Sequence, residues 1–438
     1  MPGKTWVCLL AATAVLLGCA SPQPLAEGDV VAMWTLEADR LGRGNANWRT
    51  LAIMHRAMHD AANAAWPIYA RWHPAEPGEP RADPGLPAET VSEAALAAAA
   101  RRVLVLLHPD QGGEIGRVYA RAIARVPAGP ARNAGTALGE AVADAAVRRR
   151  ANDGFASVRL FPTAQGVGGW RLAPREFLNS GTNNTAPFVS VQQGDAPPPP
   201  AVGSPQSLRE LNEVRAIGGL QSNLRTRQQS EAAAYWYYQS SQRGFIHLGL
   251  ALLAAEAPPR GFVADARLMS QLASAMADSA ILIWREKERF LYWRPVTAIQ
   301  TGLAGAAADP TWLPAIETPP HPEYPSGHAS DCFAGAVVLQ AAFPAVAGPV
   351  TYVKQPGPSA DAEVIGMGQH SRAGDSGLLA QRAFMDLGAM AEECAQSRIW
   401  AGAHFRAAVE EARRVGRLVA GRSLGAVPAL RPGTESRP

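Results

Sequence analysis

Residues 264–293 read ADARLMSQLASAMADSAILIWREKERFLYW, a stretch rich in residues with high helix propensity. No glycine or proline interrupts it, and the first proline that follows is Pro295. Proline restricts the residue before it and cannot donate a backbone hydrogen bond, so the helix should end close to Pro295. We therefore predict one long helix from Ala264 to about Trp293.

The composition of the whole chain favours the same kind of structure. Alanine is abundant among the 438 residues, aromatic residues make up 7%, and β-branched runs are short, which favours helices over sheets. The hydrophobic fraction of 47% is enough to bury a large core. The formal charge is only +3 and no long basic run occurs, which excludes a nucleic-acid-binding protein. We predict an all-α fold, with one helical-bundle domain over residues 30–425.

Helical periodicity and loop-forming residues place the other elements. We expect 152–208 to be rich in loops, because the Pro197–Pro200 run cannot lie inside a helix. The tail, 426–438, is rich in proline and is expected to be disordered. The other expected helices begin near Val30 and cover Trp48–Ala65, Ala88–Leu107, Glu114–Arg150, Thr226–Tyr238, Arg243–Ala255, Gly327–Phe343, Ser376–Ile399 and His404–Gly421.

The N-terminus looks like an export signal. The apolar run Trp6–Leu17 is too short to span a bilayer comfortably, and it leads into Leu16-Leu17-Gly18-Cys19, which looks like a bacterial lipobox. We expect residues 1–18 to be removed as a signal peptide of lipoprotein type, Cys19 to carry lipid, and residues 19–29 to form a tether. The expected location is the periplasmic face of the outer membrane, with the Cys19 lipid as the only membrane contact. An ordinary secretory signal, in which Cys19 is incidental, is the alternative.

Two cysteines remain in the body of the chain, Cys332 and Cys394. An exported protein meets an oxidising compartment, so the two can pair as a disulfide. Two buried, inert thiols are the alternative, because connectivity cannot be deduced from sequence.

Three C-terminal segments carry residues suited to an oxyanion. In the first, Lys287 and Arg294 stand seven residues apart, about two helical turns, so both are expected on one helix face. Arginine supplies a bidentate fork and lysine a point charge, which suits a small tetrahedral anion. The alternative for this segment alone is a pair of solvent-exposed cations.

The second segment is Pro319-Pro320-His321-Pro322-Glu323-Tyr324-Pro325-Ser326-Gly327-His328. An apolar helical run follows it, so Ser326 and Gly327 should lie at a helix start, where free N–H groups and the helix dipole attract anions. His328, in the first turn, would face the same anion as a proton donor or acceptor. A serine N-cap with a surface histidine is the alternative.

The third segment is Ser397-Arg398-Ile399-Trp400-Ala401-Gly402-Ala403-His404. Arg398 and His404 are six residues apart and would point in different directions on one uninterrupted helix. Gly402 offers a break that lets both face one site. Arg398 would be a third cation, and a ring nitrogen of His404 could attack phosphorus or coordinate vanadium.

With these residues in this order, the chain resembles the superfamily of type 2 phosphatidic acid phosphatases and vanadium-dependent haloperoxidases. That family's signature is Lys, six residues, Arg-Pro; then Pro-Ser-Gly-His; then Ser-Arg, five residues, His, and all three parts are matched. The segments 293–299 and 322–328, and the early helix 51–63, look typical of the long bacterial haloperoxidase branch. The resemblance covers roughly 34–421.

The resemblance implies roles for the matched residues. His404 would bind vanadium directly in a haloperoxidase or be the phosphorylated nucleophile in a phosphatase, and His328 would be the acid/base. The implied cofactor is vanadate, for whose site phosphate competes, and the implied substrates are hydrogen peroxide and halide, or a phosphate ester. The residues implied to bind the oxyanion are Lys287, Arg294, Ser326, Gly327 and Arg398.

The resemblance also implies a halide pocket. Trp284 and His321 match positions that line the halide side of the site in this branch. An aromatic residue at the position of His321 goes with chloride oxidation in the family, and a histidine there looks more like the bromide type. We therefore expect a haloperoxidase that prefers bromide. The alternatives are a periplasmic acid phosphatase acting through a phosphohistidine and a weak or inactive scaffold lipoprotein.

The chain departs from the family pattern at several positions. Many members carry an aspartate where this chain has Ala408, so another group, such as a backbone carbonyl, is expected to orient His404. The missing aspartate weighs against phosphatase chemistry, since a nucleophilic imidazole benefits from a carboxylate. Gln239 stands where a related segment often has an aspartate that can pair with the arginine of the third segment. Glu288 and Arg289 place charges where aromatic or polar residues are commoner.

Other histidines were weighed as ligands. His55 and His59 are four apart on a predicted helix beside Asp60, a spacing that can bind a metal, but the apolar pattern around them favours a core position. His247 lies in an apolar run and is expected in the core, and His370 could lie at the edge of the pocket.

Overall fold

The computed structural model describes residues 29–42, 47–157, 161–164, 166–171, 181–189, 196–238, 241–346, 350–353, 381–426 and 429–431. It is 63% helical, which confirms the all-α prediction. Its helices are α1 (Val30–Leu41), α2 (Asn47–Ala65), α3 (Ala88–Leu107), α4 (Gly112–Ile123), α5 (Pro130–Arg149), α6 (Pro205–Ile217), α7 (Arg227–Tyr238), α8 (Ser241–Ala255), α9 (Phe262–Phe290), α10 (Pro295–Thr301), α11 (Gly327–Ala342), α13 (Leu387–Trp400) and α14 (Arg406–Ala426), with short 3-10 turns at Pro109–Gln111 and Thr182–Asn184.

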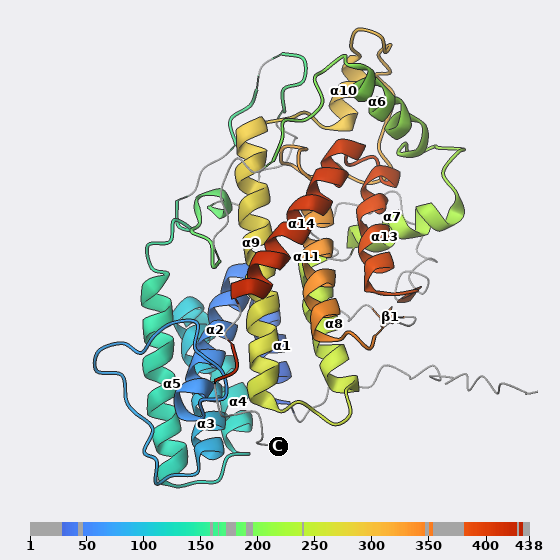
Figure 1. Ribbon diagram of the computed structural model, residues 1–438. Helices are drawn as coiled ribbons and strands as arrows, with labels where there is room; N and C mark the ends of the chain where they lie inside the picture. Colours follow the sequence, from blue (N-terminus) through green and yellow to red (C-terminus); the bar gives the residue numbers. More distant parts are fainter. Residues whose placement is uncertain are drawn as a thin grey trace, which may run out of the picture.

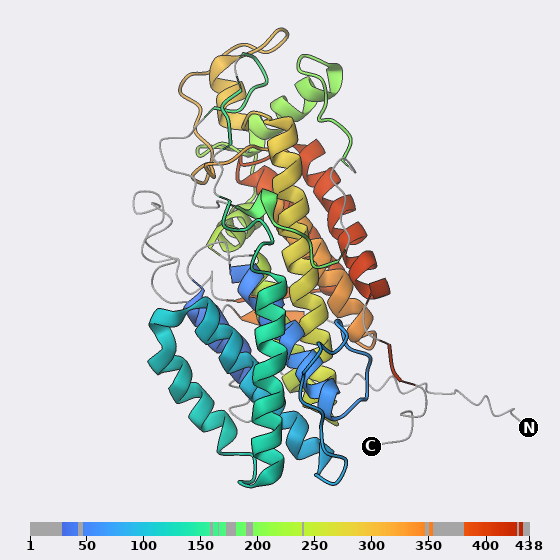
Figure 2. The same cartoon turned by 90° about the vertical axis from the view of Figure 1, so that its left-hand side faces the viewer.

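The helices form two packed bundles that share α9. In the first bundle α2 packs against α9, α3 and α5 pack against α2 and each other, and α4 packs against α3. In the second, α8, α11 and α14 pack against α9, and α13 packs against α11 (Figures 1 and 2). One continuous cluster of buried apolar side chains reaches from Val30 to Ala420 through both bundles. Among the described helices, none combines the length and apolar character needed to cross a membrane.

Two helices end where the sequence analysis did not place an end. The stretch Glu114–Arg150, expected as one helix, is divided into α4 and α5 because Pro130 starts a new helix after Gly129, whose φ of 144° no helix continues. The long helix α9 stops at Phe290, since Leu291 takes the left-handed conformation with φ 44°. Lys287 and Arg294 therefore do not share one helix face, and that part of the prediction is wrong. Arg294 is instead the N-cap of α10.

Residues 376–399 were expected to be helical throughout, and this is also wrong in part. The strand Gln381–Phe384 (β2) pairs in antiparallel fashion with Val350–Val353 (β1), and α13 begins only after Asp386, whose side chain accepts the Ala389 N–H at 2.7 Å. The Phe384 ring packs 6.1 Å from that of Trp236, so tertiary packing overrides local helix propensity here. The short helices α6 and α10 were not predicted, although each begins with proline at its first position.

The C-terminal segment makes contacts that the sequence analysis did not foresee. Helix α14 runs to Ala426, and residues beyond it return to the first bundle, where Leu430 pairs with Tyr69. The Ala70 N–H donates to the Ala429 carbonyl at 2.8 Å. The predicted signal and tether up to residue 28, which include Cys19, and the positions Gln239 and His370 lie outside the described residues.

The histidines of the apolar helices are core residues. His55 is fully buried and lies 3.2 Å from Thr35 Oγ1, and the His59 ring meets the Ala70 carbonyl at 2.9 Å. His247 contacts Asp39 Oδ2 at 3.0 Å. Nowhere in the described part of the chain do three or more metal-ligating side chains of the His, Cys, Asp and Glu types gather. These contacts agree with the core interpretation.

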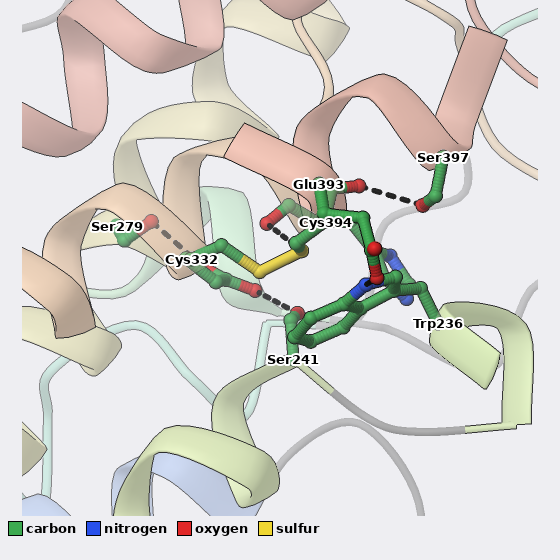
Figure 3. The surroundings of a disulfide bond; sticks show 9 residues. Trp236, Ser241, Ser279, Cys332, Glu393, Cys394 and Ser397 are labelled. Atoms are coloured by element: carbon green, nitrogen blue, oxygen red, sulfur yellow. Dashed lines mark hydrogen bonds between the residues drawn. A yellow bond between two sulfur atoms is a disulfide. The ribbon is translucent and has the colours of Figure 1, made fainter. Parts of the chain in front are cut away.

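A disulfide joins Cys332 on α11 to Cys394 on α13, which decides between the two alternatives for these cysteines (Figure 3). Both residues are fully buried. The bridge closes a loop whose ends are 62 residues apart, and the loss of such a cross-link from the unfolded chain costs about 2–4 kcal/mol of stability.

Thiol titration checks the bridge. A Cys8→Ser, Cys19→Ser protein, unfolded under oxidising conditions, should show no thiol, and two should appear after reduction. The same protein should lose several degrees in the midpoint of thermal unfolding when it is reduced. Two titratable thiols before reduction would exclude the disulfide.

Candidate active site

The three oxyanion segments of the sequence meet at one end of the second bundle. They are the C-terminal end of α9 with the turn into α10, the start of α11, and the turn between α13 and α14. This is the end of the molecule at which α6 and α10 lie (Figure 1). The side chains that come together there are largely buried, so their hydrogen bonds and charges interact through protein rather than through water.

Lys287 is fully buried and holds the segment that precedes α11 in place through hydrogen bonds. Its Nζ donates to the carbonyls of Pro322, Glu323 and Pro325 at 2.7, 2.9 and 2.6 Å. A lysine ammonium has three donors, so all of them are taken by the backbone of this segment. The predicted direct donation to an oxyanion is not seen in this arrangement, and Lys287 contributes positive charge and rigidity. Burial lowers its pKa, and Arg294 lowers it further.

Arg294 connects the three segments. Its Nε donates to the His321 carbonyl at 2.9 Å, and its Nη1 donates to the Ala403 carbonyl at 2.8 Å. The same Nη1 lies 3.1 Å from His404 Nε2, and Nη2 lies 3.0 Å from His321 Nδ1. Burial lowers the pKa of Arg294 to about 9. The guanidinium thus fixes the two histidine-bearing segments against each other.

The start of α11 has the predicted form. Ser326 is the N-cap and Gly327 is the first helical residue. A side chain at Gly327 would begin 3.2 Å from Cζ3 of Trp284, so glycine lets the indole lie against the helix start. The first N–H groups of any helix lack intrahelical acceptors. Ser326 Oγ is buried and has no hydrogen-bond partner among the described residues.

Gly402 breaks the chain between α13 and α14, as predicted. Its φ is 75°, and an added Cβ would lie 2.4 Å from the Gly218 carbonyl oxygen, so both conformation and space require glycine. The Arg398 carbonyl accepts the N–H of His404 at 3.3 Å, which folds the turn back on the helix end. The Arg398 side chain is buried, and its Nε and Nη1 have no hydrogen-bond partner within the described part of the chain. Burial lowers its pKa to about 10.

Glu323 orients His404, a role that sequence reasoning missed. His404 Nδ1 lies 2.9 Å from Glu323 Oε1, which also accepts the Phe405 N–H at 2.9 Å. A carboxylate, and not the expected backbone carbonyl, therefore holds the ring. With the proton on Nδ1, the lone pair of Nε2 faces Arg294 Nη1 at 3.1 Å. Burial raises the pKa of Glu323, while Arg294 and Lys287 oppose that rise.

His328 and His404 are held toward their neutral forms. Burial lowers the pKa of both rings, and the nearby charges of Arg294, Lys287 and Arg398 lower them further. A neutral His328 in the first turn of α11 can accept or return a proton. The rings of Trp284 and His321 lie with their centroids 5.0 Å apart beside this site, so the two predicted pocket residues are neighbours.

The residues present fit a tetrahedral oxyanion. Buried donors without partners cost free energy, and Ser326 and Arg398 bring three such atoms to one place. Burial is the main cause of the lowered pKa values of Lys287, Arg294 and Arg398, and the charge of Arg294 lowers the pKa of Lys287 further while that of Arg398 lowers the pKa of Arg294. An anion seated among them would supply both the missing acceptors and the missing negative charge.

Comparisons with known proteins agree with this geometry. Residues 267–431 match the family model of the VCPO second helical-bundle domain. A stretch of 82 residues is 40% identical to the vanadium chloroperoxidase of Curvularia inaequalis, and it covers 16% of this chain and 13% of that protein.

Solved structures share the fold over most of the chain. The first bacterial vanadium-dependent iodoperoxidase superimposes with a TM-score of 0.69 and 21% identity, over 92% of this chain and 96% of that one. An apo bacterial vanadium-dependent chloroperoxidase superimposes with a TM-score of 0.65 and 17% identity, over 87% and 92% of the two chains.

The predicted resemblance to vanadium-dependent haloperoxidases is therefore confirmed, and the family model carries it over residues 267–431. Two solved bacterial haloperoxidases share the helical fold of this chain.

Proposed function

We propose that this chain is a vanadate-dependent haloperoxidase that uses hydrogen peroxide to oxidise halide to hypohalous acid, with bromide preferred to chloride. The observation that carries the proposal is the set of buried, unpartnered donors of Ser326 and Arg398 in the same site as His404, whose Nε2 lies 3.1 Å from Arg294 Nη1. The balanced reaction converts peroxide, bromide and a proton into hypobromous acid and water.

Each residue of the site has a role in this reaction. His404 would hold vanadate through Nε2, while Glu323 fixes the ring through Nδ1. Bound vanadate supplies Lewis-acid activation of the peroxide. Arg398, Ser326 and the first N–H groups of α11 would bind the oxyanion, and Arg294 and Lys287 would offset its charge. His328 would take up and return the protons that the reaction moves.

Phosphate-ester hydrolysis through a phosphohistidine is the second candidate function. Phosphate and vanadate have the same shape, so the same cluster can hold either. The lack of an aspartate at Ala408 weighed against this chemistry in the sequence, but Glu323 supplies the carboxylate that a nucleophilic imidazole uses. The Glu323–His404 contact therefore keeps phosphate-ester hydrolysis as an alternative to halide oxidation. A non-catalytic scaffold is disfavoured, because the buried cations of the site would be costly to retain without use.

Two parallel assays separate these functions. Phosphate-free protein would be tested for bromination of an activated diketone with peroxide and bromide, with and without vanadate, and for hydrolysis of a phosphate ester. Bromination that depends on vanadate, without ester turnover, supports the proposal. Ester hydrolysis that vanadate inhibits, without bromination, would assign the chain to the phosphatases. Silence in both assays would indicate an inactive site.

His321→Phe should shift the halide preference. The imidazole lies beside the Trp284 ring, and its Nδ1 lies 3.0 Å from Arg294 Nη2. Its replacement by a phenyl ring would change the polarity that an approaching halide meets. We expect the ratio of chloride to bromide oxidation to rise about 10-fold, which corresponds to about 1.4 kcal/mol of differential barrier. The measurement is kcat/KM for each halide. His108→Phe, at the end of α3 in the first bundle, is the control, and an unchanged ratio in His321→Phe would remove that residue from the halide pocket.

A further inference from the structure

The Cys332–Cys394 disulfide lies about one helical turn from the oxyanion site. Cys332 comes four residues after His328 on α11, and Cys394 comes four residues before Arg398 on α13. At 1.5 Å per residue, each cysteine is about 6 Å along its helix from a residue of the site. The Cys394 sulfur also lies 3.7 Å from the carbonyl oxygen of His328. The disulfide therefore links α11 to α13 about one helical turn from the residues of the oxyanion site.

On the α11 side of the disulfide, hydrogen bonds join the helix to the rest of the second bundle. Asp331, next to Cys332, accepts from Ser279 Oγ of α9 at 2.8 Å and from Ser241 Oγ of α8 at 3.0 Å (Figure 3). These bonds join α11 to two neighbouring helices at the level of the disulfide. Helix α11 is therefore fixed in position, and the disulfide ties α13 to it.

The α13 side carries Arg398 near its C-terminal end. Arg398 is buried, but its Nε and Nη1 have no partner among the described residues, so contacts at these atoms do not fix the guanidinium. The backbone of α13 therefore contributes to its position. Glu393, next to Cys394, accepts from Trp236 Nε1 at 3.1 Å, and this bond and the disulfide fix the helix one turn before Arg398 (Figure 3).

We propose that the Cys332–Cys394 disulfide is a positioning cross-link for the oxyanion site, which sets the distance between the start of α11 and the Arg398 end of α13. The proposal rests on the oxyanion-binding function proposed above and assigns the bridge a part in that function beyond general stability. An oxyanion must contact both helix ends at once, so its affinity depends on their separation.

The test is the affinity for inorganic phosphate, measured by calorimetry on the full chain without vanadate. Cys332→Ala/Cys394→Ala should bind phosphate about 10- to 100-fold more weakly than the wild type. The matched control is Leu138→Ala on α5, which removes a buried side chain in the first bundle and should lower the thermal midpoint without changing the phosphate affinity. If the double alanine variant does not fold, Cys332→Val/Cys394→Ala refills part of the buried volume and takes its place.

Each outcome has a distinct meaning. Weaker binding in the cysteine variant with unchanged binding in Leu138→Ala supports the positioning role. Unchanged affinity in the cysteine variant, or an equal loss in Leu138→Ala, overturns it. A wild-type protein that binds no phosphate refutes the oxyanion site itself, and with it this proposal. Bromination by the wild type is measured separately, so failure of the haloperoxidase function alone is recognised by phosphate binding without bromination.

Discussion

Replacing His404 by alanine should abolish turnover, with a loss of at least about 10³-fold, whichever of the two enzymatic functions the protein has. Both mechanisms form a bond to Nε2 of this ring, which Glu323 and Arg294 hold in place from opposite sides. Other parts of the site can still bind an oxyanion weakly, but none offers a second nitrogen in this position within the described residues. The expected result is therefore loss of the rate together with weakened phosphate affinity.

The measurement is kcat/KM in the bromination and ester assays, beside circular dichroism of the same samples. His73→Ala is the matched control, because that ring pairs with Asp60 of the first bundle at 2.9 Å. The control should keep its full rate. Turnover retained by a folded His404→Ala protein would refute the assignment of this histidine under both functions.

Local features of the site were predicted from the sequence better than its long-range contacts. Ser326, Gly327 and Gly402 were placed correctly because a helix start and a left-handed turn have local signatures. Lys287 and Arg294 were correctly brought to one place, but for a wrong reason. The helix that carries Lys287 ends at Phe290, because Leu291, a non-glycine residue, takes the left-handed conformation, which no local rule foresees.

Long-range contacts account for what was missed. Glu323 and His404 are 81 residues apart, and Lys287 reaches carbonyls 35 to 38 residues away, so neither partnership leaves a periodic signal. Glu323 lies in the second segment, but no local pattern there indicates that its carboxylate contacts His404 of the third segment. Only the packing of α9, α11 and α14 brings these side chains together. A carboxylate close to a motif histidine in space can replace one that is missing at its usual place in sequence.

Glu323→Gln should lower vanadate affinity and the rate about 10- to 100-fold, the usual effect of removing a group that orients a metal-binding histidine. The amide oxygen can still accept from the Phe405 N–H, so the backbone should stay in place. Since Glu323 Oε2 has no partner among the described residues, an amide nitrogen there breaks no bond of the described chain. What is lost is the negative charge beside Nδ1, which stabilises the ring when it binds an electrophilic centre.

The outcome separates a positioning carboxylate from a merely buried one. Glu79→Gln is the matched control, because Glu79 is also a buried carboxylate paired with a cation, Arg71, but it lies in the first bundle. That variant can lose stability and should keep both its vanadate affinity and its rate per folded molecule. If Glu323→Gln behaves in the same way, the charge of Glu323 is not used by His404. If it loses affinity while the thermal midpoint stays near that of the wild type, the charge of Glu323 serves oxyanion binding, and its contact with His404 Nδ1 is the shortest route to the site.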